Sequence, residues 1–389
     1  MTEKTKAKKA LVVTTVASTI DQFCMNDISI LQREYQVHVA ANFILGNNTS
    51  KERVEEFKQE LKNSNIIVND VKFCRSPLSK KNFSAYKEMI ELIERNNYDI
   101  IHCHTPIAAA IVRLSARKAR RNGTKVIYTA HGFHFFKGAP KKNWLIYYPV
   151  EYFLAKYTDA IITINKEDYE RAKKSFKAAK IKYIPGVGID ISRYNSLEVN
   201  RGSKRKELGV PEEAFIVLSV GELNDNKNHL TIIKSIAKMN NPVIHYVICG
   251  KGNLENRLKD QVVKLGLENR IHLLGFRKDI AQIYKVSDVF AFPSKREGLG
   301  LAALEAMASG LPLVTSNIHG IIDYSVDGKN GFTCSPKDVD GFCEAIEKLF
   351  NNVDERVKMG KRNIEDVKNY DMELVMSEMR NIYRQILQD

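Results

Sequence analysis

The segment 286–310 constrains the fold of this chain most, because it predicts a strand, a glycine-rich turn and a helix in immediate succession. The apolar run Val286 to Phe292 is typical of a buried strand, which a proline and a serine then end. Leu301 to Ser309 has small and apolar residues at helical spacing, and a glycine and a proline follow it. Arg296 to Gly300 is therefore predicted to be a strand-to-helix turn.

The glycines of this turn predict a phosphate-binding corner. Gly298 and Gly300 let the backbone approach a ligand and leave the first helix N–H groups pointing outward, where the helix dipole favours an anion. Glu297 and Glu305 flank the corner, roughly two helical turns apart, so both can face one ligand. This spacing suits a nucleotide sugar, with one carboxylate on the ribose and the other on the sugar. The two glutamates also fit an ordinary solvated helix, and the strand-turn-helix context favours the site.

The first half of the chain alternates strand-like and helix-like segments at the spacing of βαβ units, which predicts a doubly wound parallel sheet. Six short apolar runs predict strands: Ala10–Val16, Gln36–Ala41, Ile66–Val71, Tyr98–Cys103, Lys125–Ala130 and Ala160–Ile164. Lys51–Asn63 and Phe83–Asn96 are predicted helices. Thr15 and His102 lie at the carboxyl ends of their predicted strands and His131 follows the next, where ligands bind in such sheets. Of these, we expect His102 to be a capping or packing residue.

A hinge-like segment separates the two halves. Ile181 to Tyr194 contains Pro185, Gly186 and Gly188, a composition typical of a connection that can bend. A second βαβ series follows it and begins with a strand predicted at Phe215 to Val220. At 389 residues, the chain has room for two domains with a core each. The sequence therefore predicts two α/β domains that face a cleft.

The formal net charge of +14 belongs almost wholly to the first half. Residues 1–200 contain 33 Lys and Arg against 20 Asp and Glu, whereas residues 201–389 contain 27 against 26. A basic surface fits nucleic acid, an anionic membrane or solubility alone. No zinc-finger, RNP-like or basic-zipper pattern is present, which argues against nucleic acid. The six cysteines are scattered, which argues against a zinc site or a disulfide framework and favours a reducing cytoplasm.

The segment Phe133 to Tyr157 mixes aromatic residues with lysines, and residues 101–150 contain nine Lys and Arg and no Asp or Glu. Rings at the depth of lipid headgroups, with cations against anionic lipid, are typical of a membrane-interface surface. An amphipathic core helix with a solvated basic face fits the same residues equally well. No run of about 18 apolar residues occurs, so no membrane span is predicted.

Three stretches together resemble the family 4 retaining glycosyltransferases, whose two-domain fold is called GT-B. They are SKREGLGLAALEAMASGLPLVTS around the turn, PGVGID in the hinge, and HGFHFFKGAPKKNWLIYYPVE after the fifth strand. The last is similar to the subgroup that builds capsule and exopolysaccharide repeat units on a polyprenyl diphosphate, which favours the membrane interpretation. The resemblance implies two Rossmann-like domains at residues 1–187 and 188–370, the first binding the acceptor and the second the nucleotide sugar. A C-terminal helix at 371–389 would pack back on the first domain.

The resemblance implies a role for each residue that matches the family. His131 would hydrogen-bond the donor sugar or steady charge at its reacting carbon, and Lys227 would stabilise the leaving diphosphate. Glu297 would bind sugar hydroxyls and Glu305 the ribose. The catalytic set is His131, Lys227 and Glu297, the donor set is Gly221, Lys227, Arg277, Glu297, Gly298, Leu299, Gly300 and Glu305, and the acceptor set is Thr15, His134 and Lys137.

Two departures from the family pattern leave roles vacant. Glu222 follows Gly221 directly, where the family usually has arginine, so Lys295 or Arg296 becomes the candidate for that charge. The loop after the first strand, TVASTIDQFCMND, lacks the glycine pair that many members place against the donor phosphates. Either this loop is built differently in the subgroup, or the phosphates rest wholly on the C-terminal half.

Together these inferences predict a retaining glycosyltransferase that moves a HexNAc-type sugar from a UDP-sugar to a polyprenyl-diphosphate-linked sugar, in capsular or extracellular polysaccharide synthesis. We expect no metal and no cofactor, because no Asp-x-Asp element lies in a suitable position and Lys227 with the turn amides can neutralise the diphosphate. We expect a cytoplasmic enzyme, peripheral on the inner face of the cell membrane and without a nucleic-acid partner. The alternatives are a UDP-sugar 2-epimerase of the same fold and a non-catalytic partner that binds nucleotide sugars.

Overall fold

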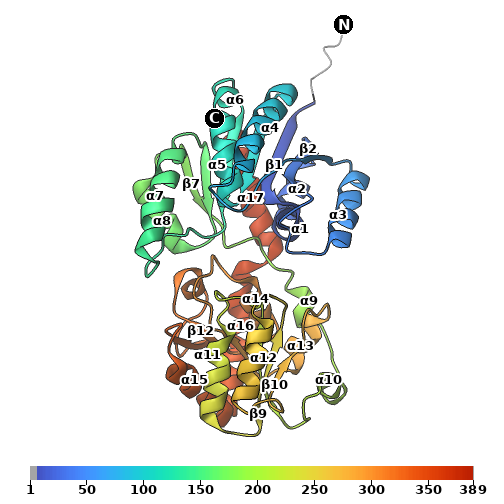
Figure 1. Cartoon of the computed structure of the whole chain (residues 1–389), viewed down its shortest axis with the longest axis vertical. Helices are drawn as coiled ribbons and strands as arrows, with labels where there is room; N and C mark the ends of the chain where they lie inside the picture. Colours follow the sequence, from blue (N-terminus) through green and yellow to red (C-terminus); the bar gives the residue numbers. More distant parts are fainter. Residues whose placement is uncertain (1–6, 389) are drawn as a thin grey trace. The chain divides into compact units, whose positions relative to one another are not determined.

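A computed structural model of the chain describes residues 7–388. The chain forms two compact units, and each is described by itself (Figure 1). Unit 1 contains the described residues up to Val187 together with those from Glu373 onward, and unit 2 runs from Gly188 to Met372. The predicted domain limits also include residues 1–6 and 389, which lie outside the described residues.

Unit 1 is built on a parallel seven-stranded sheet in the order β3-β2-β1-β4-β5-β6-β7. Its strands are β1 (Lys9–Val16), β2 (Gln36–Asn42), β3 (Ile67–Asp70), β4 (Ile100–His104), β5 (Lys125–Ala130), β6 (Ala160–Thr163) and β7 (Lys180–Tyr183). The strand order reverses between β1 and β4, which pair directly with each other. In sheets of this kind, ligands bind at the carboxyl ends of the strands beside such a switch point.

Helices cover both faces of this sheet. They are α1 (Ala17–Phe23), α2 (Met25–Leu31), α3 (Lys51–Asn63), α4 (Lys81–Asn96), α5 (Pro106–Ser115), α6 (Arg117–Arg121), α7 (Lys141–Ala155), α8 (Lys166–Ser175) and α17 (Met372–Leu387). Side chains alternate between the two faces along a strand. On β4, Ile101 and Cys103 belong to the apolar core formed with α4 and α5, whereas His102 contacts Tyr383 of α17 on the opposite face. His104 points to the same face as His102.

Unit 2 repeats the architecture with a parallel six-stranded sheet in the order β10-β9-β8-β11-β12-β13. The strands are β8 (Phe215–Val220), β9 (Ile244–Cys249), β10 (Ile271–Leu273), β11 (Val289–Phe292), β12 (Leu313–Ser316) and β13 (Gly331–Cys334). The helices are α9 (Ser192–Asn195), α10 (Arg201–Glu207), α11 (His229–Met239), α12 (Glu255–Lys264), α13 (Ile280–Val286), α14 (Leu301–Ala308), α15 (Val339–Asn351) and α16 (Val353–Asp366), with 3-10 turns η1 (His319–Asp323) and η2 (Val367–Tyr370). The predicted fold class, two doubly wound α/β domains, is confirmed.

Two local predictions are wrong. The segment after β1, which we interpreted as a loop, is mostly helix, because α1 begins directly at Ala17 and α2 follows at Met25. The hinge segment begins with a strand, β7, which pairs with β6 at the edge of the sheet. The strand was not predicted because it contains Lys180 and Lys182, and lysine is depleted in strands. At the edge of a sheet, however, lysine is tolerated.

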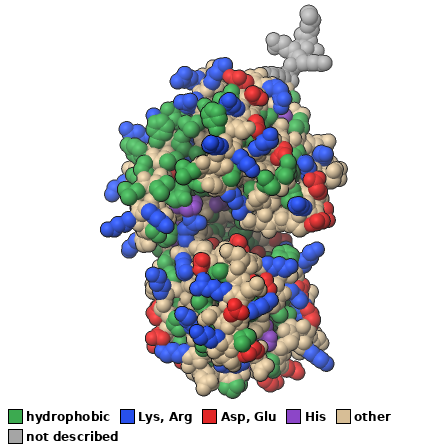
Figure 2. Space-filling view, viewed as in Figure 1, with side chains coloured by type: hydrophobic (Ala, Val, Ile, Leu, Met, Phe, Trp, Pro, Cys, Tyr) green, Lys and Arg blue, Asp and Glu red, His purple; other side chains and the backbone are tan. Residues whose placement is uncertain are grey.

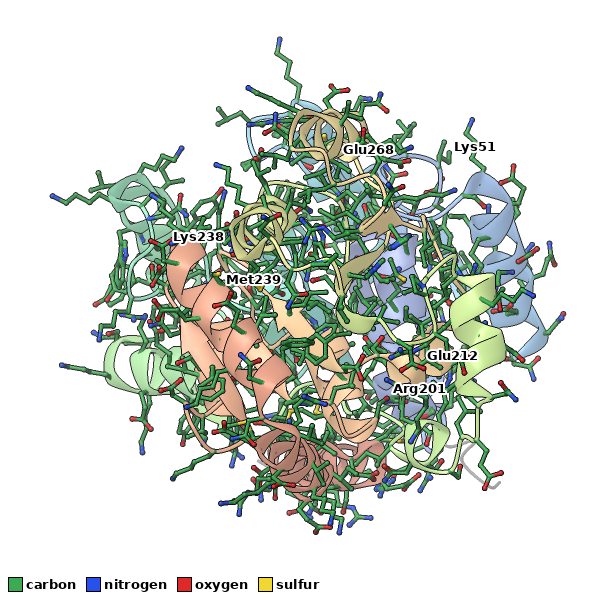
Figure 3. The ribbon with its side chains drawn as sticks, turned by 90° about the horizontal axis from the view of Figure 1, so that it is seen from below. Lys51, Arg201, Glu212, Lys238, Met239 and Glu268 are labelled. Carbon is green, nitrogen blue, oxygen red and sulfur yellow. The ribbon has the colours of Figure 1, made fainter. Side chains whose placement is uncertain are left out.

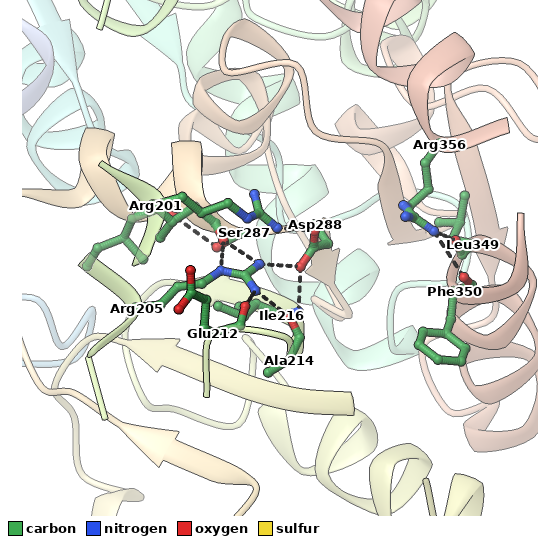
Figure 4. Close-up of polar contacts among 12 residues, drawn as sticks. Arg201, Arg205, Glu212, Ala214, Ile216, Ser287, Asp288, Leu349, Phe350 and Arg356 are labelled. Carbon is green, nitrogen blue, oxygen red and sulfur yellow. Dashed lines mark hydrogen bonds and ion pairs between the residues drawn. The ribbon is translucent and has the colours of Figure 1, made fainter. Parts of the chain in front are cut away.

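A buried arginine fixes the amino ends of two central strands of unit 2 (Figure 4). Arg205 of α10 is 2% exposed, and its guanidinium donates to the backbone carbonyls of Glu212, Ala214 and Val286. It also pairs with Asp288 at 2.8 Å. These acceptors offset the cost of burying the charge. The contacts fix the start of β8 and the turn before β11, so they set the register of the strands whose carboxyl ends carry the predicted donor residues.

Figure 3 views the ribbon from below and labels Glu212, Met239 and Glu268, which precede β8, β9 and β10 in the sequence. The labelled end is therefore the amino end of the strands of unit 2. Charged side chains gather here, such as Lys238, which pairs with Asp340 at 2.6 Å. The predicted donor residues follow strands and so belong to the opposite end of this unit.

Candidate functional site

The predicted corner lies in unit 2 between β11 and α14. β11 ends at Phe292, and α14 begins directly after Gly300, which has a φ of +98°. A Cβ on Gly300 would lie 2.6 Å from the ring of Phe292, so conformation and space both require glycine. A Cβ on Gly320 would lie 1.9 Å from the carbonyl oxygen of Gly298, so η1 packs tightly against the turn. Leu299 is buried beneath it, and the corner has one fixed backbone shape.

Lys227 and Glu297 form an ion pair beside this corner. Lys227 Nζ lies 2.7 Å from Glu297 Oε1, with the two side chains 20% and 13% exposed. The ammonium also lies 4.7 Å from the centroid of the Phe292 ring. A Cβ on Gly221 would lie 3.2 Å from the Lys227 side chain, so the glycine leaves room for the lysine. Two residues that we expected to act separately on the donor are thus paired with each other.

Three asparagines that the sequence analysis did not single out hold the loop that carries Lys227. Asn224 Oδ1 accepts a hydrogen bond from the Lys227 backbone N–H at 2.9 Å, and the Asn226 amide donates to a carbonyl of the β11–α14 turn at 2.9 Å. Asn228 has a φ of +58° and donates to two proline carbonyls, at 2.9 and 2.7 Å. Asparagine suits such a loop, because it tolerates positive φ and its amide reaches backbone groups. The run NDNKN was the available signal.

Glu305 lies on α14 with its carboxyl turned to two tyrosines. Its Oε2 accepts a hydrogen bond from the Tyr284 hydroxyl at 3.1 Å, and the Tyr194 hydroxyl also bonds the carboxyl. Burial raises the pKa of Glu305, and the two hydroxyls oppose that rise. An ionised carboxylate has about four acceptor sites, so capacity remains for the hydroxyls of a ligand.

Arg277, which we expected to contact the nucleobase, pairs with carboxylates in the structure. Its guanidinium lies 2.7 Å from Asp279 and also contacts Glu207. The side chain is 25% exposed. A nucleobase contact would therefore share Arg277 with these carboxylates, and that role stays a prediction.

Tyr324, which the sequence analysis missed, faces the same corner. Its hydroxyl is buried and has no hydrogen-bond partner among residues 7–388. The oxygen lies 3.1 Å from the point that a Cβ on Gly300 would occupy. Burial raises the pKa of Tyr324 well above its usual value, and the charge of Glu297 adds to the rise. The phenol is therefore a neutral donor beside the corner.

In unit 1, the ends of β4 and β5 bring three histidines together. His104 Nδ1 lies 3.0 Å from Nε2 of His131, the residue predicted to act at the sugar. The His102 and His104 rings lie 4.2 Å apart between centroids. Both ring nitrogens of His102 are hydrogen-bonded, to Tyr383 and to Thr129, each at 2.7 Å, which fits a packing role. Burial lowers the pKa of His131 to about 4 and that of His102 to about 3, so the cluster is uncharged near neutral pH.

Asp27 of α2 is the acidic side chain that faces these histidines, and the sequence analysis missed it. Its Oδ2 lies 3.6 Å from His104 Nε2 and 3.8 Å from His102 Nδ1. Burial raises the pKa of Asp27 to about 7. The residue lies in the segment that we interpreted as a loop, so no helical pattern pointed to it.

Asp27, His102 and His104 are also metal-binding residue types with ligand atoms within 4.8 Å of one another, a grouping found once in the part of the chain that the structure describes. The group does not fit a metal, however. Both nitrogens of His102 already have hydrogen-bond partners, and the two remaining ligands are fewer than the three or four that zinc takes from protein. The arrangement is that of a hydrogen-bonded cluster.

Thr15, predicted for the acceptor, lies at the end of β1 and is 4% exposed. Its backbone N–H donates to Thr105 Oγ1 at 3.0 Å, and its hydroxyl shares a hydrogen bond with the same oxygen at 2.7 Å. Thr105 has a φ of +64°, a conformation that costs a β-branched residue on the order of 1–3 kcal/mol. These two threonines tie the end of β4, with His104, to the end of β1.

The other two acceptor predictions lie between β5 and α7. The His134 ring stacks on Tyr147 at 4.5 Å between centroids, and its carbonyl accepts a hydrogen bond from the Asn143 amide at 3.0 Å. Lys137 has an exposed side chain, and its backbone N–H donates to Glu167 at 2.6 Å. The structure gives these residues defined positions, and their acceptor role stays a prediction.

Helix α7 carries an exposed apolar and basic surface, which we call the α7 surface. Its exposed apolar residues are Leu145, Ile146, Val150, Tyr152 and Phe153, and its exposed lysines are Lys141, Lys142 and Lys156. Figure 2 shows green hydrophobic side chains gathered over α7, with blue cations around them. Its one acid, Glu151, is buried and paired with Arg113 at 2.8 Å. Among residues 7–388, no helix is long and apolar enough to cross a membrane.

Comparisons with known proteins give the relatives of this chain. Residues 30–193 match the family model described as Glycosyltransferase Family 4, and residues 200–366 match the one described as Glycosyl transferases group 1. Putative glycosyltransferase EpsD of Bacillus subtilis is 36% identical over 356 residues, which cover 90% of each chain. The UDP-Gal:alpha-D-GlcNAc-diphosphoundecaprenol alpha-1,3-galactosyltransferase of Escherichia coli is 34% identical over 284 residues, 71% of this chain and 72% of its own.

Solved structures show the same fold at low sequence identity. HepE of Anabaena, in complex with UDP and glucose, has a TM-score of 0.78 at 20% identity and covers 97% of this chain and 100% of its own. WaaG, a glycosyltransferase involved in lipopolysaccharide biosynthesis, has a TM-score of 0.73 at 14% identity, with 96% and 99% covered. The two Rossmann-like units are therefore those of a GT-B glycosyltransferase. Because a relative at 36% identity matches nine-tenths of its length, the chain belongs to family 4 of the glycosyltransferases.

Proposed function

We propose that this glycosyltransferase moves a HexNAc-type sugar, with retention, from a UDP-sugar to a polyprenyl-diphosphate-linked sugar, in the synthesis of a capsular or extracellular polysaccharide. The observation that carries the proposal is the ammonium of Lys227, held 2.7 Å from Glu297 beside the Gly298–Gly300 corner. A relative at 34% identity is named for transfer from UDP-galactose to a GlcNAc-diphosphoundecaprenol, which supports the acceptor class and makes galactose the competing sugar.

The ion pair supports a leaving-group role for Lys227. A diphosphate has more negative charge than a carboxylate, so it competes for the ammonium when it binds at the amides of the corner. Lys227 then stabilises the charge that develops as the sugar departs, the effect that commonly contributes most to catalysis. Glu297, released from the lysine, is free to accept hydrogen bonds from sugar hydroxyls. Glu305, with tyrosine hydroxyls on its protein side, accepts those of the ribose.

The remaining roles follow the same proposal. His131 hydrogen-bonds the donor sugar, while His134 and Lys137 serve the acceptor. The hydroxyl of Thr15 is bonded to Thr105, so Thr15 serves the acceptor by shaping the end of β1. Attack and departure occur on the same face of the sugar, and the leaving diphosphate takes the acceptor proton. This path forms the new glycosidic bond as the bond to diphosphate breaks, and it needs no protein nucleophile.

The test is a donor panel with the purified full chain and a short-chain polyprenyl diphosphate GlcNAc. The donors are offered in turn: UDP-GlcNAc, UDP-GalNAc, UDP-galactose and UDP-glucose. Mass spectrometry identifies the products, and NMR determines the anomeric configuration. We expect a new disaccharide from a HexNAc donor with the configuration retained. A product from UDP-galactose alone would correct the sugar, and an inverted anomer would overturn the mechanism.

The same panel without acceptor separates the competing functions. A 2-epimerase would convert or hydrolyse its UDP-sugar with no acceptor present, whereas a transferase needs the lipid. A non-catalytic partner would bind UDP and turn over nothing under any condition. Because Lys227 and Glu297 form an ion pair beside the glycine turn and Glu305 follows the turn on α14, we expect turnover that depends on the acceptor.

We also propose that the α7 surface docks the enzyme on an anionic membrane, where such an acceptor is embedded. Leu145 and Ile146 are 78% and 57% exposed to water, and insertion among lipids would bury these apolar side chains. Lys156 lies 3.9 Å from the centroid of the Phe153 ring, which pairs a cation with an aromatic ring at the same depth. Cations near an anionic surface contribute about 1 kcal/mol each.

Vesicle flotation tests the docking proposal. We expect the chain to float with phosphatidylglycerol vesicles and to stay at the bottom with phosphatidylcholine vesicles. The double variant Leu145→Ser/Ile146→Ser should lose flotation, and the matched control Leu78→Ser, 96% exposed elsewhere in unit 1, should keep it. Equal recovery with neutral and anionic vesicles would contradict the basic surface.

A further inference from the structure

His131 has one ring nitrogen committed inside the protein. Its Nε2 lies 3.0 Å from Nδ1 of His104, so its Nδ1 is the nitrogen left for a ligand. Only one of the two facing nitrogens carries the hydrogen of that bond in neutral imidazoles. If His131 Nε2 carries it, His131 Nδ1 is bare and accepts hydrogen bonds. If His104 Nδ1 carries it, His131 Nδ1 holds a hydrogen and can only donate.

The other nitrogen of His104 decides between these two states. His104 is 1% exposed, and its Nε2 has no hydrogen-bond partner within residues 7–388. The oxygen that faces it is Oδ2 of Asp27 at 3.6 Å, slightly longer than a hydrogen bond. His102 does not compete for this carboxylate, because both its nitrogens are already bonded. A carboxylate only accepts, so it favours the form of His104 with hydrogen on Nε2 and a bare Nδ1.

We propose that Asp27, acting through His104, fixes the tautomer of His131, so that Nε2 of His131 carries the hydrogen and Nδ1 accepts a hydrogen bond from a hydroxyl of the donor sugar. The contact with the sugar rests on the proposed function, whereas the tautomer does not. Asp27 and His104 are positioning residues in this arrangement. The physical logic is that of any buried carboxylate that orients an imidazole through the nitrogen remote from the ligand.

The position of these residues supports a role at a site rather than in the core alone. Asp27, His104 and His131 line one cavity of unit 1, together with Thr129 and apolar side chains of α17 such as Met376. The Asp27 carboxyl is only 16% exposed and has no hydrogen-bond donor among residues 7–388, so its loss of water costs stability. Natural proteins keep such costs at functional sites more often than in structural cores.

The arrangement also predicts which group responds to pH. The titratable groups that face Asp27 from the surrounding elements are Cys24, His102, His104, His131 and Tyr383. Burial holds the pKa values of Cys24 and Tyr383 well above neutrality and those of the three histidines well below it. Asp27, with a pKa of about 7, is therefore the group that changes charge near neutral pH. A protonated Asp27 can donate to His104 Nε2, which reverses both bonds and leaves a hydrogen on His131 Nδ1.

The test reads the ring nitrogens directly by NMR of the full chain labelled with ¹⁵N histidine. Bare and hydrogen-bearing ring nitrogens have widely separated shifts, and the variant His131→Gln identifies the His131 signals among the nine histidines. At about pH 8.5, where Asp27 is ionised, we expect His131 to show a hydrogen-bearing Nε2 and a bare Nδ1. In Asp27→Ala, both forms should be populated. An unchanged His131 pattern in Asp27→Ala would overturn the proposal.

Two further variants separate positioning from folding. His104→Phe keeps a ring in place and removes the link, so it should release the His131 tautomer as Asp27→Ala does. Tyr383→Phe removes a hydroxyl from the same cluster, at 2.7 Å from His102, and should leave the His131 pattern unchanged. A change of equal size in Tyr383→Phe would mean that any loss of packing shifts the tautomer, and would also overturn the proposal.

Transfer assays then distinguish this proposal from the proposed function. We call the link from Asp27 through His104 to His131 the relay. If the His131 nitrogen pattern changes in the Asp27 variants and the acid limb of the pH–rate profile disappears in Asp27→Asn, the relay and the role of His131 are both supported. If the nitrogen pattern follows Asp27 while the pH–rate profile of Asp27→Asn matches the wild type, the relay stands and the contact with the sugar is wrong. If the wild-type chain transfers no sugar, the proposed function fails and the nitrogen pattern still decides the relay.

Discussion

Each unit holds an ion pair between a long cation and a glutamate over an aromatic ring, and the two pairs differ in where they lie. In unit 1, Arg113 of α5 lies 2.8 Å from Glu151 of α7 and 4.4 Å from the centroid of the Tyr128 ring, with side chains 0% and 7% exposed. In unit 2, Lys227 lies 2.7 Å from Glu297, with side chains 20% and 13% exposed. The chemistry of the two pairs is similar, and their surroundings are not.

The surroundings decide what each pair can do. Arg113 and Glu151 join α5 to α7. Because both side chains are buried, a ligand could reach them only if the surrounding core opened. The two charged groups lie 2.8 Å apart, so each compensates the charge of the other in the interior. Lys227 and Glu297 lie on loops after β8 and β11, at strand ends, where the proposed function has a diphosphate replace the carboxylate. We therefore expect the position of an ion pair in an α/β unit to decide whether it is a structural pair or one that a ligand can separate.

Removing one partner of the buried pair should have the largest effect. Glu151→Gln leaves the Arg113 charge buried without compensation, which costs about 3–5 kcal/mol. The single tryptophan, Trp144 on α7, reports the unfolding of unit 1 by fluorescence in urea. Glu297→Gln should leave that transition of unit 1 unchanged. In unit 2, where the pair is partly exposed, it should lower the free energy of unfolding by at most about 1 kcal/mol, measured by circular dichroism. Equal losses in the two variants would erase the distinction between the pairs.

Lys227→Ala should have the next largest effect, on catalysis rather than on stability. Loss of one group that stabilises the departing charge reduces the rate by about 10²–10³, or roughly 2.7–4 kcal/mol. Transfer is measured with the donor that the panel identifies, at saturating acceptor. Lys234→Ala, an exposed lysine on α11, is the matched control and should retain full activity. If Lys227→Ala were as fast as this control, the Lys227–Glu297 pair would be structural, like the Arg113–Glu151 pair of unit 1.

Sequence patterns predicted the parts of the site that lie close together along the chain. The corner from Phe292 to Gly300 needs only a strand pattern, glycines and a helix pattern, so it could be predicted in full. The contact between Lys227 and Glu297 spans 70 residues and depends on asparagine amides that cross from one loop to the other. Residue types alone carry no sign of that pairing.

The histidine cluster shows the same limit in unit 1. His104 and His131 are 27 residues apart and meet because β4 and β5 are neighbours in register, with His104 opposite Thr129. Strand order and register depend on the whole sheet, so single-sequence patterns do not fix them. To predict the position of Asp27, one would also have had to predict that its segment is helical, although the segment lacks clear periodicity.

A second contrast sets two half-buried carboxyls against each other, one in each unit. Asp27 faces imidazoles at 3.6 and 3.8 Å, and Glu305 receives tyrosine hydroxyls. Asp27→Asn should stabilise unit 1 by about 2–4 kcal/mol above pH 7. The folded pKa of about 7 lies above the usual value near 4, each pKa unit corresponds to about 1.4 kcal/mol, and solvent at the 16% exposed side chain screens part of the effect. The fold disfavours the ionised form, so this gain is complete above the folded pKa and vanishes as pH falls to about 4.

Trp144 fluorescence in urea at several pH values measures that gain. The control Asp21→Asn should change stability in the opposite direction, because Asp21 pairs with Arg53 at 2.8 Å and the variant loses that partner. If Asp27→Asn were less stable than the wild type at about pH 8, the carboxylate would have a stabilising partner, and the contrast between Asp27 and Glu305 would be wrong.

Glu305→Gln should have the smallest effect, and it tests the carboxyl of unit 2. Because burial raises the pKa of Glu305, its carboxylate takes up a proton earlier than usual as pH falls. A carboxylate that accepts ribose hydroxyls loses that capacity on protonation, so UDP affinity should decrease as pH falls through the raised pKa. Calorimetry should show this decrease in the wild type, and an affinity in Glu305→Gln that is weaker by about tenfold, or 1.4 kcal/mol, and flat across the same range.

Glu344→Gln, an exposed glutamate on α15, is the matched control and should bind UDP with the wild-type affinity and pH dependence. A decrease on acidification that persists in Glu305→Gln would assign the titration to another group, and Glu305 would then be a partner of the two tyrosines alone. Because Gln keeps an oxygen that can accept from the Tyr284 and Tyr194 hydroxyls, Glu305→Gln should change the stability of unit 2 little. Loss of affinity without loss of stability is therefore the outcome that separates a ligand-binding carboxylate from a positioning one.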